Sequence, residues 1–129
     1  MKYKYRWEVV IYEGDSDDGD VPIHSLEMRL DSPIKLVERF LESEVGSGLI
    51  GMAHYIKTME QRRKKVIPND GYPGNAIIVD VFDEMTRLTD FFSKEVCEIE
   101  TLELYALMAV WSSGTYLYYE RGYTIDQLP

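Results

Sequence analysis

The residues whose types most suggest chemistry are the carboxylates of segment 13–20, which alternate with glycine and serine as EGDSDDGD. A calcium-binding loop repeats its oxygen ligands at every second position around a sharp turn and ends on a bidentate glutamate. Counted from Asp15, a ligand falls at Asp17, but Gly19 and Leu26 occupy later ligand positions. This register argues against a calcium site, and we expect a solvated loop whose acidic side chains can contact a basic partner. These candidate contacts are Asp15, Asp17, Asp18 and Asp20.

A second set of carboxylates lies in segment 76–93, which we interpret as a helix. Asp80, Asp83 and Glu84 would share its polar face, where two carboxylates at helical spacing can hold a magnesium ion with help from another element. Asp83 and Arg87, however, would form an acid-before-base pair at i,i+4, as on an ordinary solvated helix face. We therefore expect no metal here and count the three carboxylates as candidate contacts for a partner.

Nucleophilic or zinc chemistry would have to use Cys97, His24 and His54, which are the only cysteine and the only histidines in the sequence. They are far apart, and no nucleophile-elbow or paired-cysteine pattern accompanies them. Acidic neighbours of Cys97 would raise the pKa of its thiol rather than activate it. We therefore predict no catalytic residue, no metal site, no cofactor and no enzymatic activity.

Gly46, Gly48 and Gly51 reproduce the spacing G-x-G-x-x-G of dinucleotide-binding proteins. That fingerprint must follow a strand within a parallel βαβ unit. Here a predicted helix at 33–45 precedes it, and the stretch that follows is rich in lysine and arginine. We expect these glycines to end one helix and to allow a tight corner before the next.

A basic patch of four consecutive residues stands out against the acidic chain. Segment 47–66 carries five basic side chains against Glu60, so the net charge of −9 divides into +4 here and −13 elsewhere. Such separation can steer and orient a charged partner. Net acidity argues against a general nucleic-acid-binding surface, because phosphate contacts need a basic footprint. The basic patch consists of Arg62, Arg63, Lys64 and Lys65.

Four further candidates for partner contacts lie around the last predicted helix. Glu100 and Glu103 add to the acidic surface, and Tyr116 and Tyr119 belong to a group of tyrosines near the C-terminus. Tyrosine is enriched at interfaces, since it buries area and keeps a polar group, but it also fills cores. Both roles remain open for these tyrosines.

The elements that position these residues begin with a hairpin. Residues 2–12 alternate aromatic or β-branched side chains, such as Tyr5, Trp7 and Val9, with charged ones, which predicts a half-buried strand. A second alternating segment at 21–30 predicts an antiparallel partner across the acidic loop. Because a lone hairpin is marginally stable, helices must cover its aromatic face.

Apolar residues at helical spacing predict about four helices, at 33–45, 49–65, 76–93 and 101–121. The start of the third is also compatible with a buried strand, but its periodic pattern persists for about 16 residues, which favours a helix. Prolines, glycines and asparagines mark a breaker loop at 67–75. The order of elements predicts an α+β fold, with a single domain over residues 1–129.

The composition limits the class of protein. The 129 residues are 45% hydrophobic and 29% charged, which is typical of a globular domain. No apolar run approaches the roughly 18 residues that a membrane span needs, and the N-terminus lacks the apolar core of a signal peptide. One cysteine fits a reducing compartment. We expect a cytoplasmic protein that makes no contact with membranes.

Charge and aromatic residues together favour a small acidic interaction protein. It would be a non-enzymatic inhibitor or adaptor that binds a basic protein, and the acidic surface could imitate nucleic acid if that partner is a nucleic-acid-binding protein. This description fits inhibitors from phages and mobile elements, and immunity proteins for toxins. Association that weakens with salt would support it.

Two other hypotheses use different features. Helix 101–121 is apolar on most sides, as in a homo-oligomeric structural or assembly subunit. Alternatively, the carboxylates of segment 76–93 could serve a small metal-dependent enzyme. A stable oligomer would support the former hypothesis, and binding of a divalent metal would support the latter.

Overall fold

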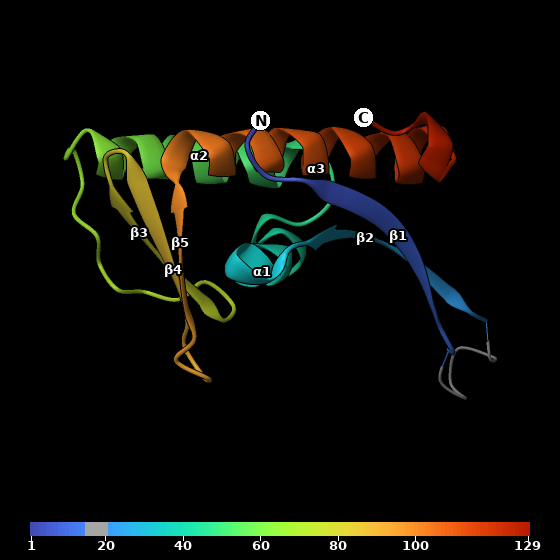
Figure 1. Cartoon of the computed structure of the whole chain (residues 1–129), viewed down its shortest axis with the longest axis horizontal. Coiled ribbons are helices and arrows are strands. Elements are labelled where there is room, and N and C mark those ends of the chain that lie inside the picture. The colour runs from blue at the N-terminus through green and yellow to red at the C-terminus, as the bar shows by residue number, and fades with distance from the viewer. Residues whose placement is uncertain (15–20) are drawn as a thin grey trace.

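The computed structural model describes residues 1–14 and 21–129, which contain two antiparallel sheets and three α-helices (Figure 1). A two-stranded sheet consists of β1 (Tyr5–Tyr12) and β2 (Ile23–Leu30), and a three-stranded sheet of β3 (Ile77–Phe82), β4 (Met85–Asp90) and β5 (Val96–Glu100). The helices are α1 (Lys35–Arg39), α2 (Leu49–Arg63) and α3 (Thr101–Arg121), and a 3₁₀ turn at Ile125–Gln127 follows α3. The predicted α+β class is confirmed, with three helices instead of about four.

The N-terminal hairpin forms as predicted, with somewhat shorter strands. Trp7 of β1 lies opposite Met28 of β2, so the two side chains share one face of the ribbon. On that face the indole of Trp7 stacks on Trp111 of α3, with ring centroids 6.1 Å apart and an interplanar angle of 22°. The aromatic face of β1 is therefore covered by a helix, as the sequence requires.

The first predicted helix, 33–45, is a succession of three helical forms. A 3₁₀ turn at Ser32–Ile34 leads into α1, which continues as a π-helical stretch at Phe40–Val45. Gly46 ends it with a φ of 74°, and the Gly46 N–H donates to the Leu41 carbonyl. This segment contacts both sheets, because α1 packs against β2 as well as against β4 and β5.

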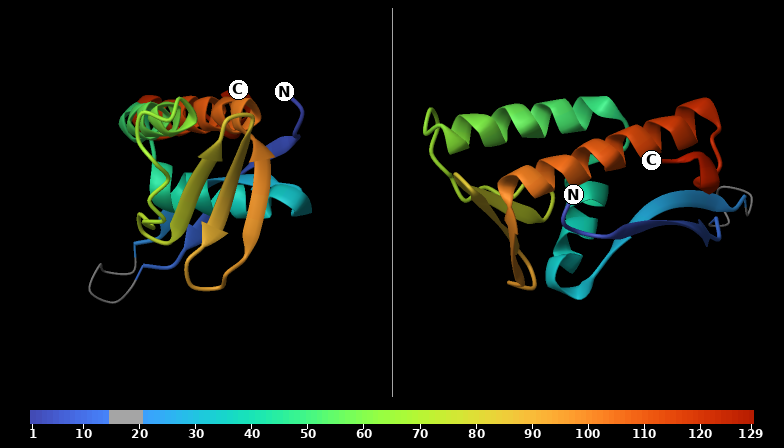
Figure 2. Two further views of the ribbon diagram at one scale, coloured as in Figure 1. Left: turned by 90° about the vertical axis from the view of Figure 1, so that its left-hand side faces the viewer. Right: turned by 45° about the horizontal axis from the view of Figure 1, so that its top comes forward.

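The helices α2 and α3 lie side by side and antiparallel (Figure 2). At one end the Gly48 N–H donates to Thr115 Oγ1 (2.9 Å), and at the other the Tyr105 hydroxyl donates to Glu60 Oε2 (3.0 Å). α3 has the predicted bounds, and Gly122 closes it in the left-handed conformation, with a φ of 68°. Within the described part of the chain, no helix is long and apolar enough to cross a membrane.

Segment 76–93 is not the predicted helix but the hairpin of β3 and β4, joined by a turn at Asp83 and Glu84. Both strands bury every second residue, which is the strand period. Two six-residue strands joined by so short a turn give an apolar pattern as long as that of a helix. The length of this pattern was the reason for predicting a helix. Asp80 and Arg87 therefore lie opposite each other on neighbouring strands.

The inner face of the three-stranded sheet is buried against the helices. Its side chains are Ile77, Val79, Val81, Thr86, Leu88, Asp90, Cys97 and Ile99. The polar ones have partners, since the hydroxyls of Thr86 and Thr101 are hydrogen-bonded (2.8 Å) and Asp90 forms an ion pair with Arg39. Buried apolar side chains from both sheets and all three helices form one core cluster.

The predicted breaker loop runs along the edge of β3 and closes it. The side-chain amide of Asn69 donates to the Val81 carbonyl (3.1 Å) and accepts the Val81 N–H (3.0 Å), as a neighbouring strand would. Farther along the same edge, Arg62 donates to the Val79 carbonyl (2.7 Å). An open strand edge can pair with other chains, so these side chains protect the sheet from such pairing.

Candidate partner-binding surfaces

The structure brings four of the predicted acidic residues together at one end of the three-stranded sheet. Asp83 and Glu84 form the β3–β4 turn, Glu100 ends β5 and Glu103 lies in the first turn of α3. The Thr101 N–H donates to the Glu84 carbonyl (2.8 Å), which fastens the turn to the start of α3. The candidates in the acidic loop lie outside the described residues; they are Asp15, Asp17, Asp18 and Asp20.

We call the uncovered face of the three-stranded sheet the outer sheet face. Figure 2 (left) shows the three strands in front, α1 behind them and the other two helices above. None of the described helices packs on this face, because the helix contacts fall on the inner one. Its side chains form three cross-strand rows: Ile78, Thr89 and Val96; Asp80, Arg87 and Glu98; and Phe82, Met85 and Glu100.

Large apolar side chains are exposed on the outer sheet face. Phe82 is 53% exposed and Val96 is 58% exposed. Phe91 continues the outward positions of β4 and is 42% exposed, while Ile78 and Met85 are half-buried. Apolar side chains therefore border the charged middle row on both sides.

Arg87 is held in a fixed position in that charged row. Its Nε donates to Glu98 Oε1 (3.1 Å), and its guanidinium lies 5.1 Å from the centroid of the Phe82 ring. Asp80 lies opposite Arg87 on β3 but forms no ion pair within residues 1–14 and 21–129. Its carboxylate is the one in this row that remains without a cationic partner there.

Glu100 and Glu103 fasten the N-terminal segment to α3. The Tyr3 hydroxyl donates to Glu100 Oε1 (3.0 Å), and Lys2 Nζ lies 3.3 Å from the same oxygen. Burial opposes ionisation of Glu100, but these two partners outweigh it and lower the pKa of the carboxyl. Glu103 accepts the backbone N–H of Lys2 (2.9 Å). Both predicted contact residues therefore have internal partners.

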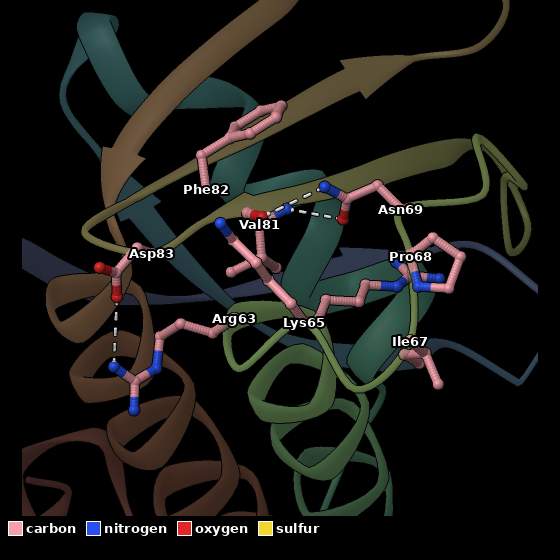
Figure 3. A pocket seen from close by; sticks show the side chains of 9 residues that line it. Arg63, Lys65, Ile67, Pro68, Asn69, Val81, Phe82 and Asp83 are labelled. Atoms are coloured by element: carbon pink, nitrogen blue, oxygen red, sulfur yellow. Dashed lines mark hydrogen bonds and ion pairs between the residues drawn. The ribbon is translucent and has the colours of Figure 1, made fainter.

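A groove of about 570 Å³ adjoins the outer sheet face, between the end of α2 and the edge of β3 (Figure 3). Arg63 and Asp83 form an ion pair (3.4 Å) at one side of it. Lys65 lines it too, and the Phe82 ring belongs both to this groove and to the outer sheet face. The groove thus joins the apolar sheet surface to the basic end of α2.

The fold divides the predicted basic patch. Arg62 is largely buried, because it donates to the edge of β3 and pairs with Asp70 (3.1 Å). Arg63 donates to Glu60 Oε1 (2.9 Å) in addition to its pair with Asp83. Lys64 and Lys65 are exposed. Much of the basic charge is thus neutralised within the protein, and the patch is smaller than the sequence suggests.

Tyr116 and Tyr119 lie near the C-terminal end of α3, and the structure does not group them with the acidic residues. The Tyr119 hydroxyl accepts the Leu26 N–H (2.8 Å) and thereby joins α3 to β2. The Tyr116 hydroxyl accepts a hydrogen bond from Arg121 Nε (3.2 Å). Tyr119 therefore has a structural role in holding the hairpin.

Sequence reasoning missed a group of carboxylates around Arg29 on the second face of the hairpin. Arg29 pairs with Glu8 (2.9 Å), Glu27 (3.1 Å) and Glu38 (3.4 Å). Glu8 above all raises the pKa of the guanidinium. The four side chains come from β1, β2 and α1, so no local sequence pattern could have joined them. Because Glu27 is buried, we interpret this group as stabilising the fold and not as a contact for a partner.

Apolar side chains are also exposed in two other areas. The end of the β1–β2 hairpin exposes Ile11 and Ile23, at 61% and 54%, beside Tyr12 and Val21. At the start of α2, Ile50 is 88% exposed. These areas are alternatives to the outer sheet face as places where a partner could bind.

The side chains considered for catalysis are placed apart. Cys97 is buried on the inner sheet face, where burial, together with Glu98, raises the pKa of its thiol. His24 and His54 are both exposed, on β2 and α2 respectively. Among the described residues, no group of three or more His, Cys, Asp or Glu is arranged to hold a metal ion.

Comparisons with known proteins add one relationship. No family model matches the chain, and no solved structure matches it. A curated protein of Bacillus cereus, named "Immunity protein", is 32% identical to the chain over 114 residues. The alignment covers 86% of this chain and 86% of that protein.

Proposed function

The chain belongs to the same family as the immunity protein of Bacillus cereus, and from this premise we propose that it is itself an immunity protein. In this role it binds a toxin protein and prevents that toxin from harming the cell that makes both. The observation that carries the proposal is the relationship itself, since it extends over 86% of each chain.

The proposed mode of action is direct binding in a fixed stoichiometry, without catalysis. Exposed side chains such as Phe82 and Val96, on a sheet surface that no described helix covers, support this mode. Aromatic and aliphatic groups exposed together are typical of surfaces that bind proteins. Binding of this kind blocks a toxin for as long as the complex lasts.

The proposed partner is basic where it contacts this chain. The net charge of −9, divided into +4 in segment 47–66 and −13 elsewhere, would attract such a partner and orient it during encounter. A toxin that acts on nucleic acid offers a basic cleft, and it would be one partner of this type. We place the interaction in the cytoplasm, where the unpaired Cys97 stays reduced.

Co-expression of this chain with the product of each adjacent gene, as candidate toxin, tests the proposal. Cells that express the toxin alone should stop growing, and cells that also express this chain should grow. Titration of the purified proteins should reach complete inhibition at a fixed molar ratio, because each bound molecule blocks one toxin. Raising the salt concentration should weaken the complex, because screening reduces attraction between exposed opposite charges.

Growth arrest that persists with this chain fully expressed would contradict the proposal. Protection by far less than one molecule per toxin would instead indicate catalysis. Binding that does not depend on salt would be compatible with the immunity role. It would contradict the proposal that the partner surface is basic.

A further inference from the structure

The outer sheet face has a composition that the fold itself does not require. In an antiparallel sheet covered on one side, the other side is solvated and carries mostly polar residues. Here Phe82 and Val96 are more than half exposed, and Ile78 and Met85 are half-buried apolar residues on the same face. These side chains contribute little to the core, since the opposite face of each strand supplies the buried residues.

The surface is also preformed. It lies on three hydrogen-bonded strands, and the turn between two of them is tied to the first residue of α3, Thr101. Arg87 is held between Glu98 and the Phe82 ring. A partner that docks here would order few side chains, so little conformational entropy would be lost on binding.

The charges on this face are predominantly acidic, with Asp80, Glu98 and Glu100 against Arg87. On the face itself, Asp80 lacks a cationic partner among the described residues, and the only basic side chain, Arg87, is already paired. The margins carry both signs: Glu84 and Glu95 are exposed, and so are Lys94, 4.6 Å from the Phe91 ring, and Lys65 in the adjoining groove. A partner with a lysine or arginine between apolar side chains would complement the charge on the face itself.

We propose that the outer sheet face is the surface through which this chain binds its toxin, and that the toxin presents a basic side chain flanked by apolar ones. This inference rests on the proposed immunity function and assigns the toxin contact to one surface of the protein. The apolar contacts lie in the two outer rows, with Ile78 and Val96 on one side and Phe82 and Met85 on the other. Asp80, in the charged row between them, faces a basic group of the toxin.

The test uses charge-introducing variants at matched exposed positions. Phe82→Arg and Val96→Arg place a cation in the proposed contact, on two different strands. Ile23→Arg and Ile50→Arg place the same side chain on the hairpin end and on α2, at positions that are 54% and 88% exposed. All four sites are at the surface, and thermal unfolding of each purified variant checks that it is folded.

Affinity for the toxin identified by co-expression is then measured by calorimetry, with the full chain. Phe82→Arg and Val96→Arg should each raise Kd by about tenfold or more, as expected for residues central to an interface. Ile23→Arg and Ile50→Arg should stay within about twofold of the original chain, as expected outside the contact. Asp80→Asn should weaken binding and reduce its dependence on salt.

Hydroxyl-radical footprinting of the unmodified complex gives a second measurement that needs no variant. Oxidation of Phe82 and Met85 should fall when the toxin is bound, while oxidation of Tyr12 at the hairpin end should not change. Protection of Tyr12 alone, or loss of affinity only in Ile23→Arg or Ile50→Arg, would overturn the assignment to the outer sheet face.

The two proposals fail in different ways. If the unmodified chain neither binds nor neutralises the toxin, the immunity function itself is wrong. If it does both, and Phe82→Arg and Val96→Arg bind as tightly as it does, the function stands and the outer sheet face is not the contact.

Discussion

The indole of Trp7 lies over Gly114 so closely that a β-carbon at position 114 would come within 2.4 Å of the ring. Glycine in the middle of a helix is normally unfavourable, because it adds backbone freedom to the unfolded chain. In α3 its lack of a side chain lets β1 approach the helix and lets Trp7 stack on Trp111. The glycine is thus a requirement of the contact between sheet and helix.

Gly114→Ala should therefore destabilise the protein, although alanine is the better helix former. The added methyl group must displace a large ring in a packed site, which costs about 1–3 kcal/mol. Urea denaturation measures this loss. Ser113→Ala, at the exposed neighbouring position, should leave stability unchanged or raise it by a few tenths of a kcal/mol. If both variants gain stability, the close contact is not as described.

Glu44 should make a pH-dependent contribution to stability. Its carboxylate accepts the backbone N–H groups of Asn75, Ala76 and Ile77 and the Tyr55 hydroxyl. Burial opposes ionisation, but these donors outweigh it and lower the pKa of the carboxyl. A lowered pKa gives stability that is complete above the ordinary value of 4.5 and is lost as the pH falls through the lowered pKa.

Glu44→Gln should cost about 2 kcal/mol at pH 7, since it removes the charge and leaves backbone donors with a poorer acceptor. The difference from the original chain should shrink below pH 4.5. Glu42→Gln is the matched control: burial and Glu27 raise the pKa of the Glu42 carboxyl, so this variant should not lose stability at pH 7. Denaturation curves that move equally for both variants would refute the assignment.

Asn69→Ala should open the edge of β3. The variant loses both hydrogen bonds to Val81, and the freed N–H becomes accessible to water. We expect the Val81 amide to exchange with deuterium about tenfold faster, because a net hydrogen bond contributes about 1 kcal/mol or slightly more. The Leu88 amide in the central strand serves as an internal control and should change less. Equal acceleration at both amides would indicate global destabilisation instead.

Cys97 should be unreactive in the folded protein. Its side chain is buried, and burial raises the pKa of its thiol, so the nucleophilic thiolate is scarce and inaccessible. A thiol reagent such as dithionitrobenzoate should react about 100-fold more slowly with the native chain than with the chain in guanidinium. Rapid reaction in the native state would show that the inner sheet face opens readily.

Elements with strong local signals were predictable from the sequence. The alternation around Trp7 identified the hairpin, and Gly122 fixed the end of α3 because it takes up a left-handed conformation there. The β3–β4 hairpin was not identified. Its turn at Asp83 and Glu84 contains no glycine. Asp83 itself adopts a φ of 63°, a backbone conformation that residues other than glycine seldom adopt. Without a glycine the two strands resemble one helix-length segment.

The sequence predicted individual residues of the candidate surface but not their arrangement. The sequence suggested Asp80, Asp83 and Glu84 as candidate contacts but placed them on the polar face of a helix instead of on a strand and a turn. Phe82 and Val96 could be recognised as exposed only once the strands had a register. The pairing of β4 with β5 is a tertiary relationship that no short pattern contains.

The contact between Trp7 and Trp111 has a consequence for how the protein is made. Apart from its pairing with β2, β1 finds its packing partners in α3 and in the turn at Ile125–Gln127. β1 leaves the ribosome about a hundred residues before α3, so the aromatic face of the hairpin stays exposed to water while the chain between them is made. β1 is therefore made long before the helix that covers it.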